Sequence, residues 1–195
     1  RCDGLAESSS LSALVAVTEH FPVITIGKTG DPETIRCPEN ELGKKGIALC
    51  RTDRGGDVTF HGPGQAVVYP VFSLKEARLG LREYLRQLEN IGIEFLESVN
   101  IRAERRQGLT GIWVGSRKIA SIGVGVRRWI TMHGISINVQ KDMPGFENIV
   151  PCGIAGCRIT SVDRETGEIN DVSAVGRGIA EKLRAFLQAR MSRKS

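Results

Sequence analysis

The strongest constraint on the fold is a long amphipathic helix predicted over residues 81–99, between two runs of short strand-like segments. Its apolar residues recur with the helical period: Leu81, Tyr84, Leu85, Leu88, Ile91, Phe95, Leu96 and Val99. The opposite face carries Arg82, Arg86, Glu89 and Glu97, and Gly92 weakens the helix without breaking the pattern. Such a helix must bury its apolar face against a sheet or another helix.

Short apolar segments bounded by glycine, proline or aspartate predict strands on both sides of this helix. They cover residues 14–18, 23–26, 47–51 and 65–72 before it, and 101–106, 111–114, 118–126 and 129–139 after it. Turns are predicted at Gly115-Ser116 and at residues 126–129. These runs predict the α+β class, with mixed β-sheets packed with helices, rather than regular βαβ winding.

A second amphipathic helix is predicted near the end of the chain, from about Val172 to Arg190, with Asp171 as its N-cap. Its apolar face consists of Val172, Val175, Ile179, Leu183, Phe186 and Leu187. There is no internal repeat or linker, so residues 1–195 are expected to form one domain, with residues 1–12 mobile.

Composition excludes several classes of function. The sequence contains no run of about 18 apolar residues, so it predicts no membrane-spanning helix. The net charge is +5, but basic residues are scattered and only 5% of residues are aromatic, which argues against nucleic-acid binding. Docking of an acidic protein and an ordinary solvated surface both remain compatible with this charge.

The five cysteines have an odd count and irregular spacing, which favours a reducing compartment over a disulfide framework. The three histidines, His20, His61 and His133, lie far apart in sequence. A zinc site would need scattered ligands, so we expect no metal.

The most unusual stretch is the glycine-rich segment from Arg54 to Gln65, which contains His61. Glycines allow backbone N–H groups to approach an anion or a carbonyl. The segment lacks the Gly-Lys-Ser/Thr of a nucleotide-binding P-loop and the spacing of a dinucleotide fingerprint. A plain hairpin connection is the alternative to a binding loop.

Lys118 lies in a strongly apolar run, and strand alternation predicts that it shares a face with Ala120 and Ile122. Desolvation on such a face would favour the neutral amine. The spacing alone leaves open an edge lysine in water. Downstream, His133-Gly134 repeats the His-Gly pair at residue 61, so we expect both histidines to line one pocket.

Cys152 stands between Pro151 and Gly153, after the apolar pair Ile149-Val150. The proline fixes the approach of the chain, and the glycine leaves room around the sulfur, as an exposed and oriented thiol requires. A buried inert cysteine fits the same residues.

Taken in order, these residues resemble the lipoyl(octanoyl) transferase family, over about residues 14–162. The resemblance rests on residues 19–28, 54–65, 111–114, 118–123 and 133–138, and on Pro151-Cys152-Gly153-Ile154 with Thr160-Ser161. Two residues depart from the usual pattern: Phe60 stands where many members have tyrosine, and Phe21 where proline is common. The opening segment that usually precedes residue 14 is expected to be absent or replaced.

The resemblance implies the fold of biotin and lipoate protein ligase catalytic domains. It also implies octanoyl transfer from acyl carrier protein to a lysine of lipoyl domains, with Cys152 as nucleophile and Lys118 as base. The implied acceptors are lipoyl domains of 2-oxoacid dehydrogenase complexes and the glycine cleavage H protein, without cofactor, nucleic acid or membrane. The implied location is the cytoplasm of a bacterium, or the mitochondrion or plastid of a eukaryote.

The resemblance also implies which residues contact the substrate, and backbone N–H groups near Cys152 and Lys118 are expected to form an oxyanion hole. The expected substrate-binding residues are Arg54, Gly55, Gly56, Asp57, Thr59, His61, Gly62, Gly64, Gln65, Ser121, Ile122, Gly123, His133, Gly134 and Ile135. The residues expected to dock acidic acyl carrier protein are Arg102, Arg105, Arg106, Arg127 and Arg128. The alternatives are an ATP-dependent lipoate or biotin ligase, which does not need Cys152, and a non-catalytic relative that binds the carrier.

Overall fold

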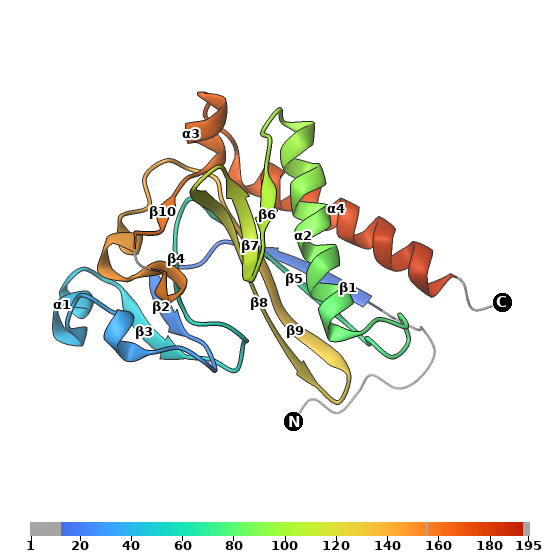
Figure 1. The fold of residues 1–195 in the computed structure, drawn as a ribbon, viewed down its shortest axis with the longest axis horizontal. Coiled ribbons are helices and arrows are strands. Elements are labelled where there is room, and N and C mark those ends of the chain that lie inside the picture. Colours follow the sequence, from blue (N-terminus) through green and yellow to red (C-terminus); the bar gives the residue numbers. More distant parts are fainter. Residues whose placement is uncertain (1–12, 155, 193–195) are drawn as a thin grey trace.

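The computed structural model describes residues 13–154 and 156–192, with Cys152 described by its backbone. The expected mobility of residues 1–12 therefore lies outside the described residues. Two β-sheets stand side by side, and two long helices cover the larger one (Figure 1).

The larger sheet contains seven strands. Six follow one another in space as β1 (Ala13–Thr18), β5 (Gln65–Phe72), β9 (Ile130–Asn138), β8 (Arg117–Arg127), β7 (Leu109–Val114) and β6 (Glu104–Arg106), each antiparallel to its neighbour. The seventh, β10 (Arg158–Ile159), pairs in parallel with the start of β8.

The smaller sheet has the order β3 (Ala48–Arg51), β2 (Val23–Ile26), β4 (Val58–His61). Around it lie α1 (Glu39–Lys44) and the 3₁₀ turns η1 (Pro32–Thr34), η2 (Pro144–Asn148) and η3 (Pro151–Gly153). The sheet has its own apolar core, formed by Ile24, Ile26, Cys37, Leu42, Ile47, Val58, Phe60, Phe146 and Ile149. Segments from both halves of the chain therefore build this layer.

The helices α2 (Leu81–Ser98) and α4 (Val172–Met191) pack on one face of the larger sheet and on each other. Their apolar faces form the main core with inward residues of β5, β8 and β9. Asp171 caps α4 by accepting a hydrogen bond from the Ala174 N–H, as predicted. Between β10 and α4 lies the short helix α3 (Val162–Thr166).

The α+β class, both long helices and all eight predicted strands are confirmed, most with small shifts at their ends. The predicted strand over residues 101–106 is confirmed only at its end, as β6. The segment Arg54–Gln65 contains a strand of its own, β4, which the glycines on both sides conceal. On α2, Glu89 belongs to the face predicted to be polar, yet its side chain is only 2% exposed.

Among the described residues, we find no helix of sufficient length and apolar character to cross a bilayer.

Candidate functional site

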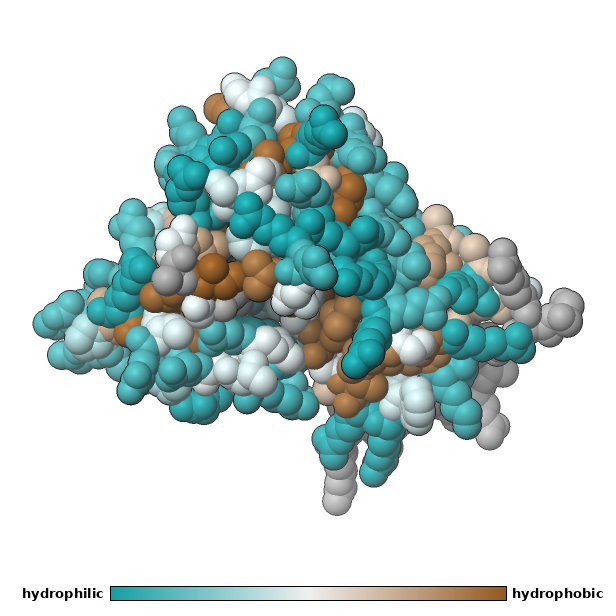
Figure 2. All heavy atoms as spheres, viewed as in Figure 1, coloured by the Kyte–Doolittle hydropathy of each residue, from teal (hydrophilic) through white to brown (hydrophobic). Residues whose placement is uncertain are grey.

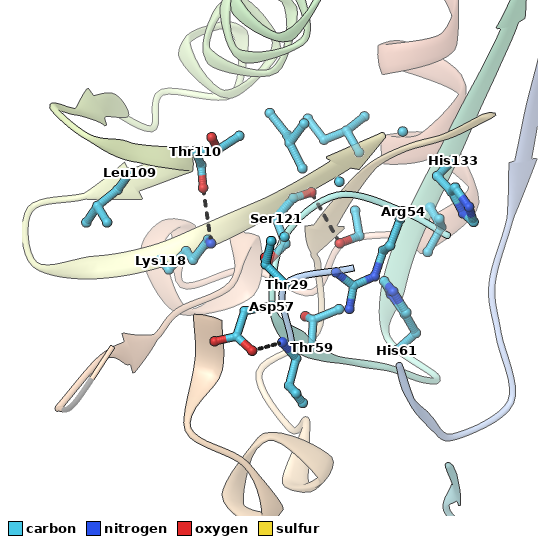
Figure 3. A pocket seen from close by; sticks show the side chains of 18 of the residues that line it. Thr29, Arg54, Asp57, Thr59, His61, Leu109, Thr110, Lys118, Ser121 and His133 are labelled. Atoms are coloured by element: carbon cyan, nitrogen blue, oxygen red, sulfur yellow. Dashed lines mark hydrogen bonds between the residues drawn. The ribbon is translucent and has the colours of Figure 1, made fainter. Parts of the chain in front are cut away.

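A cavity of about 270 Å³ lies between the two sheets, on the side of the larger sheet opposite the helices. It is near the lower end of the usual size of ligand sites, about 300–1,000 Å³. Residues of β4 line it from the smaller sheet, and residues of β5, β7, β8 and β9 line it from the larger one (Figure 3). On the face shown in Figure 2, apolar side chains gather along the hollow between the two sheets.

Lys118 lies at one end of this cavity and is buried, with 2% of its surface exposed. Its Nζ donates a hydrogen bond to the Thr110 carbonyl at 3.3 Å and stands 5.5 Å from the centre of the Trp113 ring. The structure therefore rules out the edge lysine in water.

The predicted face for Lys118 is wrong, because the register between β7 and β8 shifts near Lys118. Ile112 pairs with Ala120, but Trp113 pairs with Lys118, so β8 contains one extra residue here. Such a bulge reverses the alternation of side chains. Lys118 consequently faces the cavity with Ser121, while Ala120 belongs to the core under the helices.

Gly111, opposite this bulge, has a φ of +132°, which favours glycine. A Cβ on Gly111 would lie 2.7 Å from Lys118 Cε, so the glycine backbone forms the wall against which the lysine packs. The Gly111 N–H donates to the buried Glu89 carboxylate at 3.2 Å, and this carboxylate also forms ion pairs with Arg86 and Arg105. Helix α2 thereby fixes the backbone that positions Lys118.

The backbone of the turn that carries Cys152, η3, lies against the same cavity. Gly153, with a φ of +65°, packs so closely on Asp57 that a Cβ would lie 2.4 Å from Asp57 Oδ2. Asp57 lines the cavity, and so does Ile154, directly after the turn. The N–H groups of Gly153 and Ile154 donate to Val150 and Pro151 carbonyls, so these two donors serve the turn itself.

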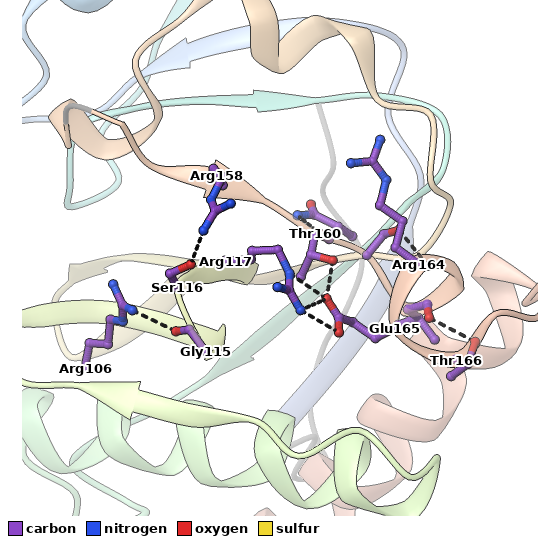
Figure 4. Close-up of polar contacts among 12 residues, drawn as sticks. Arg106, Gly115, Ser116, Arg117, Arg158, Thr160, Arg164, Glu165 and Thr166 are labelled. Atoms are coloured by element: carbon purple, nitrogen blue, oxygen red, sulfur yellow. Dashed lines mark hydrogen bonds and ion pairs between the residues drawn. The ribbon is translucent and has the colours of Figure 1, made fainter.

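The chain then returns to Lys118. Strand β10 pairs Ile159 with Lys118, and the Thr160 N–H donates to the Lys118 carbonyl at 3.0 Å. Thr160 and Arg117 both bind the Glu165 carboxylate, which ties α3 to this end of β8 (Figure 4). Backbone pairing thus fixes the segment after Cys152 beside the strand that carries Lys118.

His61 lines the cavity and is held by a buried polar chain. Its Nδ1 lies 2.6 Å from the Gln65 side-chain oxygen, and the Gln65 amide donates to Asn138 at 2.9 Å. Asn138 in turn donates to the Thr160 carbonyl at 3.0 Å, so the chain ends at the residue that anchors Lys118. Burial lowers the pKa of His61 to about 4, so its imidazole is neutral at pH 7.

His133 lines the same cavity, so the expectation that both histidines line one pocket is confirmed. It has a positive φ of 61°, uncommon for a residue other than glycine, and its Nε2 lies 2.6 Å from an Asp53 carboxylate oxygen. Tyr69 contacts two histidines. Its hydroxyl lies 2.6 Å from His20 Nε2, and its ring meets the His133 ring edge-on.

Most of the expected substrate-binding residues surround this cavity: Arg54, Gly56, Asp57, Thr59, His61, Ser121, Ile122, Gly123, His133, Gly134 and Ile135. The other four, Gly55, Gly62, Gly64 and Gln65, do not line it. Gly55 instead donates to the Val124 carbonyl, which fixes the glycine-rich segment on β8. Arg54 is buried and donates to the carbonyl and hydroxyl of Thr25 on β2, so it ties the glycine-rich segment to the smaller sheet.

Several lining residues were not expected from the sequence, among them Thr29, Tyr69 and Thr110. Tyr69 had a usable signal, because it follows Gln65 and Val67 with the period of two along β5. For Thr29 and Thr110 the sequence gives no such signal, because only contacts between distant parts of the chain bring them to the site. In the part of the chain that the structure describes, no three histidine, cysteine, aspartate or glutamate side chains form a group able to hold a metal ion.

Comparison with known proteins agrees with the motifs. Residues 5–184 match the lipoyl protein ligase A/B catalytic domain family. An octanoyltransferase of Clostridium kluyveri is 45% identical over 166 residues, covering 84% of this chain and 71% of the relative. An octanoyltransferase of Geobacter metallireducens is 44% identical over 188 residues, covering 96% and 84%. The sequence resemblance is thereby confirmed.

Solved structures agree on the fold. A lipoate-protein ligase A bound with ATP superposes with a TM-score of 0.72 at 16% identity, covering 93% of this chain and 82% of that one. The biotin protein ligase of Aquifex aeolicus, in complex with biotin and ATP, gives 0.58 at 17% identity, covering 87% and 72%. At these identities the likeness concerns the fold alone, and it confirms the expected ligase-like architecture. The family match over residues 5–184, together with relatives above 40% identity, shows that the chain belongs to the lipoyl protein ligase A/B catalytic domain family.

Proposed function

We propose that this chain is an octanoyltransferase, an acyltransferase that moves an octanoyl group from acyl carrier protein to a lysine of a lipoyl domain. Cys152 is the nucleophile and Lys118 the base. The two relatives named above support the reaction, since both are octanoyltransferases more than 40% identical to this chain.

One structural observation supports the assignment of the two residues. The turn that carries Cys152 and the buried Lys118 border one cavity, and the pairing of β10 with β8 joins them. An activated nucleophile needs a base within reach and an enclosed site for the acyl group. The neutral His61 and the ordered polar chain behind it supply a rigid wall for that site.

The reaction then has two steps. The Lys118 amine takes the Cys152 thiol proton, the thiolate attacks the donor thioester, and the carrier thiolate leaves with the proton that the Lys118 ammonium returns. In the second step the acceptor amine attacks the new thioester, Lys118 takes the amine's proton, and Cys152 leaves as a thiolate. Because a thioester is exchanged for a more stable amide, no nucleotide is consumed.

The cavity suits a slender apolar chain beside a polar reaction centre. Val67, Ile122 and Ile135 line it. A Cβ on Gly123 would lie 2.9 Å from the Gly55 carbonyl oxygen, so this glycine lets the glycine-rich segment pack closely on β8 at the cavity wall. We assign the octanoyl chain to this apolar region, with its carbonyl at the end that holds Lys118.

Intact-mass measurement after incubation with octanoyl-acyl carrier protein tests the proposal. The protein is expected to gain one octanoyl group, mapped to Cys152, and to lose it when a lipoyl domain is added. Cys152→Ser is expected to abolish acylation, while the matched control Cys157→Ser keeps most of it. Acylation that survives in Cys152→Ser and disappears in Cys157→Ser would show that Cys152 is not the nucleophile.

The same assay separates the two alternatives. An ATP-dependent ligase requires nucleotide and free octanoate, whereas we expect transfer to be unchanged after apyrase removes all ATP. A non-catalytic relative binds the carrier without forming an acyl-enzyme or octanoylating the lipoyl domain. Strict dependence on ATP would move this chain to the ligases.

A further inference from the structure

A second cavity, of about 290 Å³, lies on the other side of the segment that carries Cys152. Pro151, Ile154, Cys157 and Ile159 form one of its walls, and Ile154 also lines the first cavity. Ile154, directly after η3, therefore lies between the two cavities. A thioester has two sides, the acyl chain and the thiol arm, so a nucleophile between two cavities can accept one side in each.

The second cavity is rich in cations. Arg36, Lys141 and Arg164 line it, all three exposed, together with one carboxylate, that of Glu147. Within the described part of the chain, none of these three cationic groups takes part in an ion pair or a side-chain hydrogen bond. Figure 4 shows the Arg164 guanidinium turned away from the nearby ion pair of Arg117 with Glu165.

Other arginines are already used inside the molecule. Of those expected to dock an acidic partner, Arg105 forms an ion pair with Glu89, and Arg106 lies over the Trp113 ring and donates to the Gly115 carbonyl. Arg127, by contrast, lies at the opposite end of β8 from Lys118. Arg36, Lys141 and Arg164 instead line the cavity beside the nucleophile-bearing turn.

The backbone fixes these cations close to the turn. The Arg36 N–H donates to the Asn148 carbonyl at 2.8 Å, and Val150 donates to Thr34 at 2.7 Å, so the segment of Arg36 runs along the chain just before Cys152. Arg164 is the third residue of α3 and lies four residues after Thr160, whose N–H donates to the Lys118 carbonyl. Both sides of the cavity are thus anchored to the site of reaction.

We propose that the second cavity binds the thiol arm of the acyl donor, and that Arg36, Lys141 and Arg164 bind a phosphate group on that arm. The inference rests on the proposed octanoyl transfer and adds a recognition site to it. Flexible cations that converge on one cavity suit an anionic phosphate, whereas the acyl chain itself carries no charge. A carrier protein and coenzyme A both present such a phosphate at the end of a thiol arm.

The test uses two small donors that differ only in this group: octanoyl-4′-phosphopantetheine and octanoyl-pantetheine. The wild-type protein is expected to prefer the phosphorylated donor in kcat/KM. The triple variant Arg36→Gln/Lys141→Gln/Arg164→Gln is expected to lose about 10- to 100-fold on that donor, since each exposed contact contributes about two- to fivefold. Its activity on octanoyl-pantetheine is expected to stay within about twofold.

A matched control removes the same net charge elsewhere: Lys75→Gln/Arg82→Gln/Arg177→Gln alters three exposed residues away from both cavities. It is expected to behave as wild type on both donors, and thermal melting checks that both triple variants are folded. Octanoyl-coenzyme A and octanoyl-acyl carrier protein then identify the source of the phosphate, because a loss confined to the carrier protein indicates that protein's arm.

The outcomes separate this inference from the proposed function. Equal losses on the two small donors, no loss on either, or a wild-type protein without preference for the phosphate would overturn the phosphate site while octanoyl transfer stands. Failure of the wild-type protein to accept octanoyl from any donor would instead overturn the proposed function.

Discussion

Glu89 is predicted to act as a positioning residue for Lys118, although it does not reach the cavity. Its carboxylate accepts the Gly111 N–H, and Gly111 forms the wall beside Lys118 Cε. Glu89→Ala removes this acceptor and leaves a buried N–H without a partner. We expect Gly111 to shift and Lys118 to move with it, because the two are in direct contact.

The cost to stability follows from these contacts. A hydrogen bond to a buried carboxylate is worth about 1.5–3 kcal/mol. The ion pairs add less, about 0.5 kcal/mol each, because the side chains of Arg86 and Arg105 are 59% and 35% exposed and water screens them. Glu89→Ala is therefore expected to lower the free energy of unfolding by about 2–4 kcal/mol. Glu89→Gln keeps an acceptor oxygen and is expected to lose about 1 kcal/mol.

The effect on the reaction is expected to be separate from stability. A displacement of a catalytic group by about 1 Å can lower a rate by about 100-fold. Single-turnover acylation by octanoyl-acyl carrier protein, at a temperature where every variant is folded, is expected to slow at least about tenfold in Glu89→Ala. Glu89→Gln is expected to restore most of the rate, and its pH–rate profile to match wild type.

The exposed Glu97 lies on the same helix and provides a control, since Glu97→Ala is expected to change neither rate nor stability by much. Urea unfolding gives the stability of each variant. The reasoning would be refuted by a Glu89→Ala protein that is destabilised as expected yet acylates at the wild-type rate with an unchanged pH profile. Glu89 would then only join α2 to β7.

Two further predictions concern the site itself. Lys118→Arg keeps the positive charge but cannot act as a base, so it is expected to lose about two to four orders of magnitude in rate, nearly as much as Lys118→Ala; near-normal turnover from pH 6 to 9 would exclude the base role. For His61, burial holds the folded-state pKa near 4, below the ordinary 6.5, so the unfolded chain binds the proton first as the pH falls. Stability is therefore full above pH 6.5 and declines towards pH 4, by up to about 1.4 kcal/mol per pH unit. Urea unfolding at several pH values is expected to show a smaller slope in His61→Gln, and an identical slope in both proteins would contradict this.

The parts of the fold that were predictable from sequence are those with strong local signals. The period of α2 extends over 18 residues, and β5 lies between turn residues, so neither depends on distant contacts to be recognised. The helix α3 has five residues and β10 has two, which is too short for any period to be counted. Strand β4 is four residues long and lies in a glycine-rich segment that reads as a turn.

The burial of Glu89 and the direction of the Lys118 side chain show a different limit of prediction from sequence. A period of 3.6 residues places Glu89 among polar neighbours, but only tertiary packing brings β7 over that position of the helix. Similarly, a period of two holds along a strand until a bulge interrupts it, and the bulge next to Lys118 in β8 depends on how β7 pairs with β8. Both errors concern the same few residues, since Glu89 holds β7, the strand that pairs with β8 at the bulge that turns Lys118 towards the cavity.

This coincidence has a physical reason. A lysine that stayed on the same face of β8 as Ala120 would point into the apolar core under the helices, where it could meet no substrate. Bringing its amine into the cavity requires a break in the regular strand, and a break requires support from elsewhere. Glu89, the positive φ of Gly111 and the pairing of β10 supply that support. The residues that local rules describe worst are therefore those that make Lys118 available for reaction.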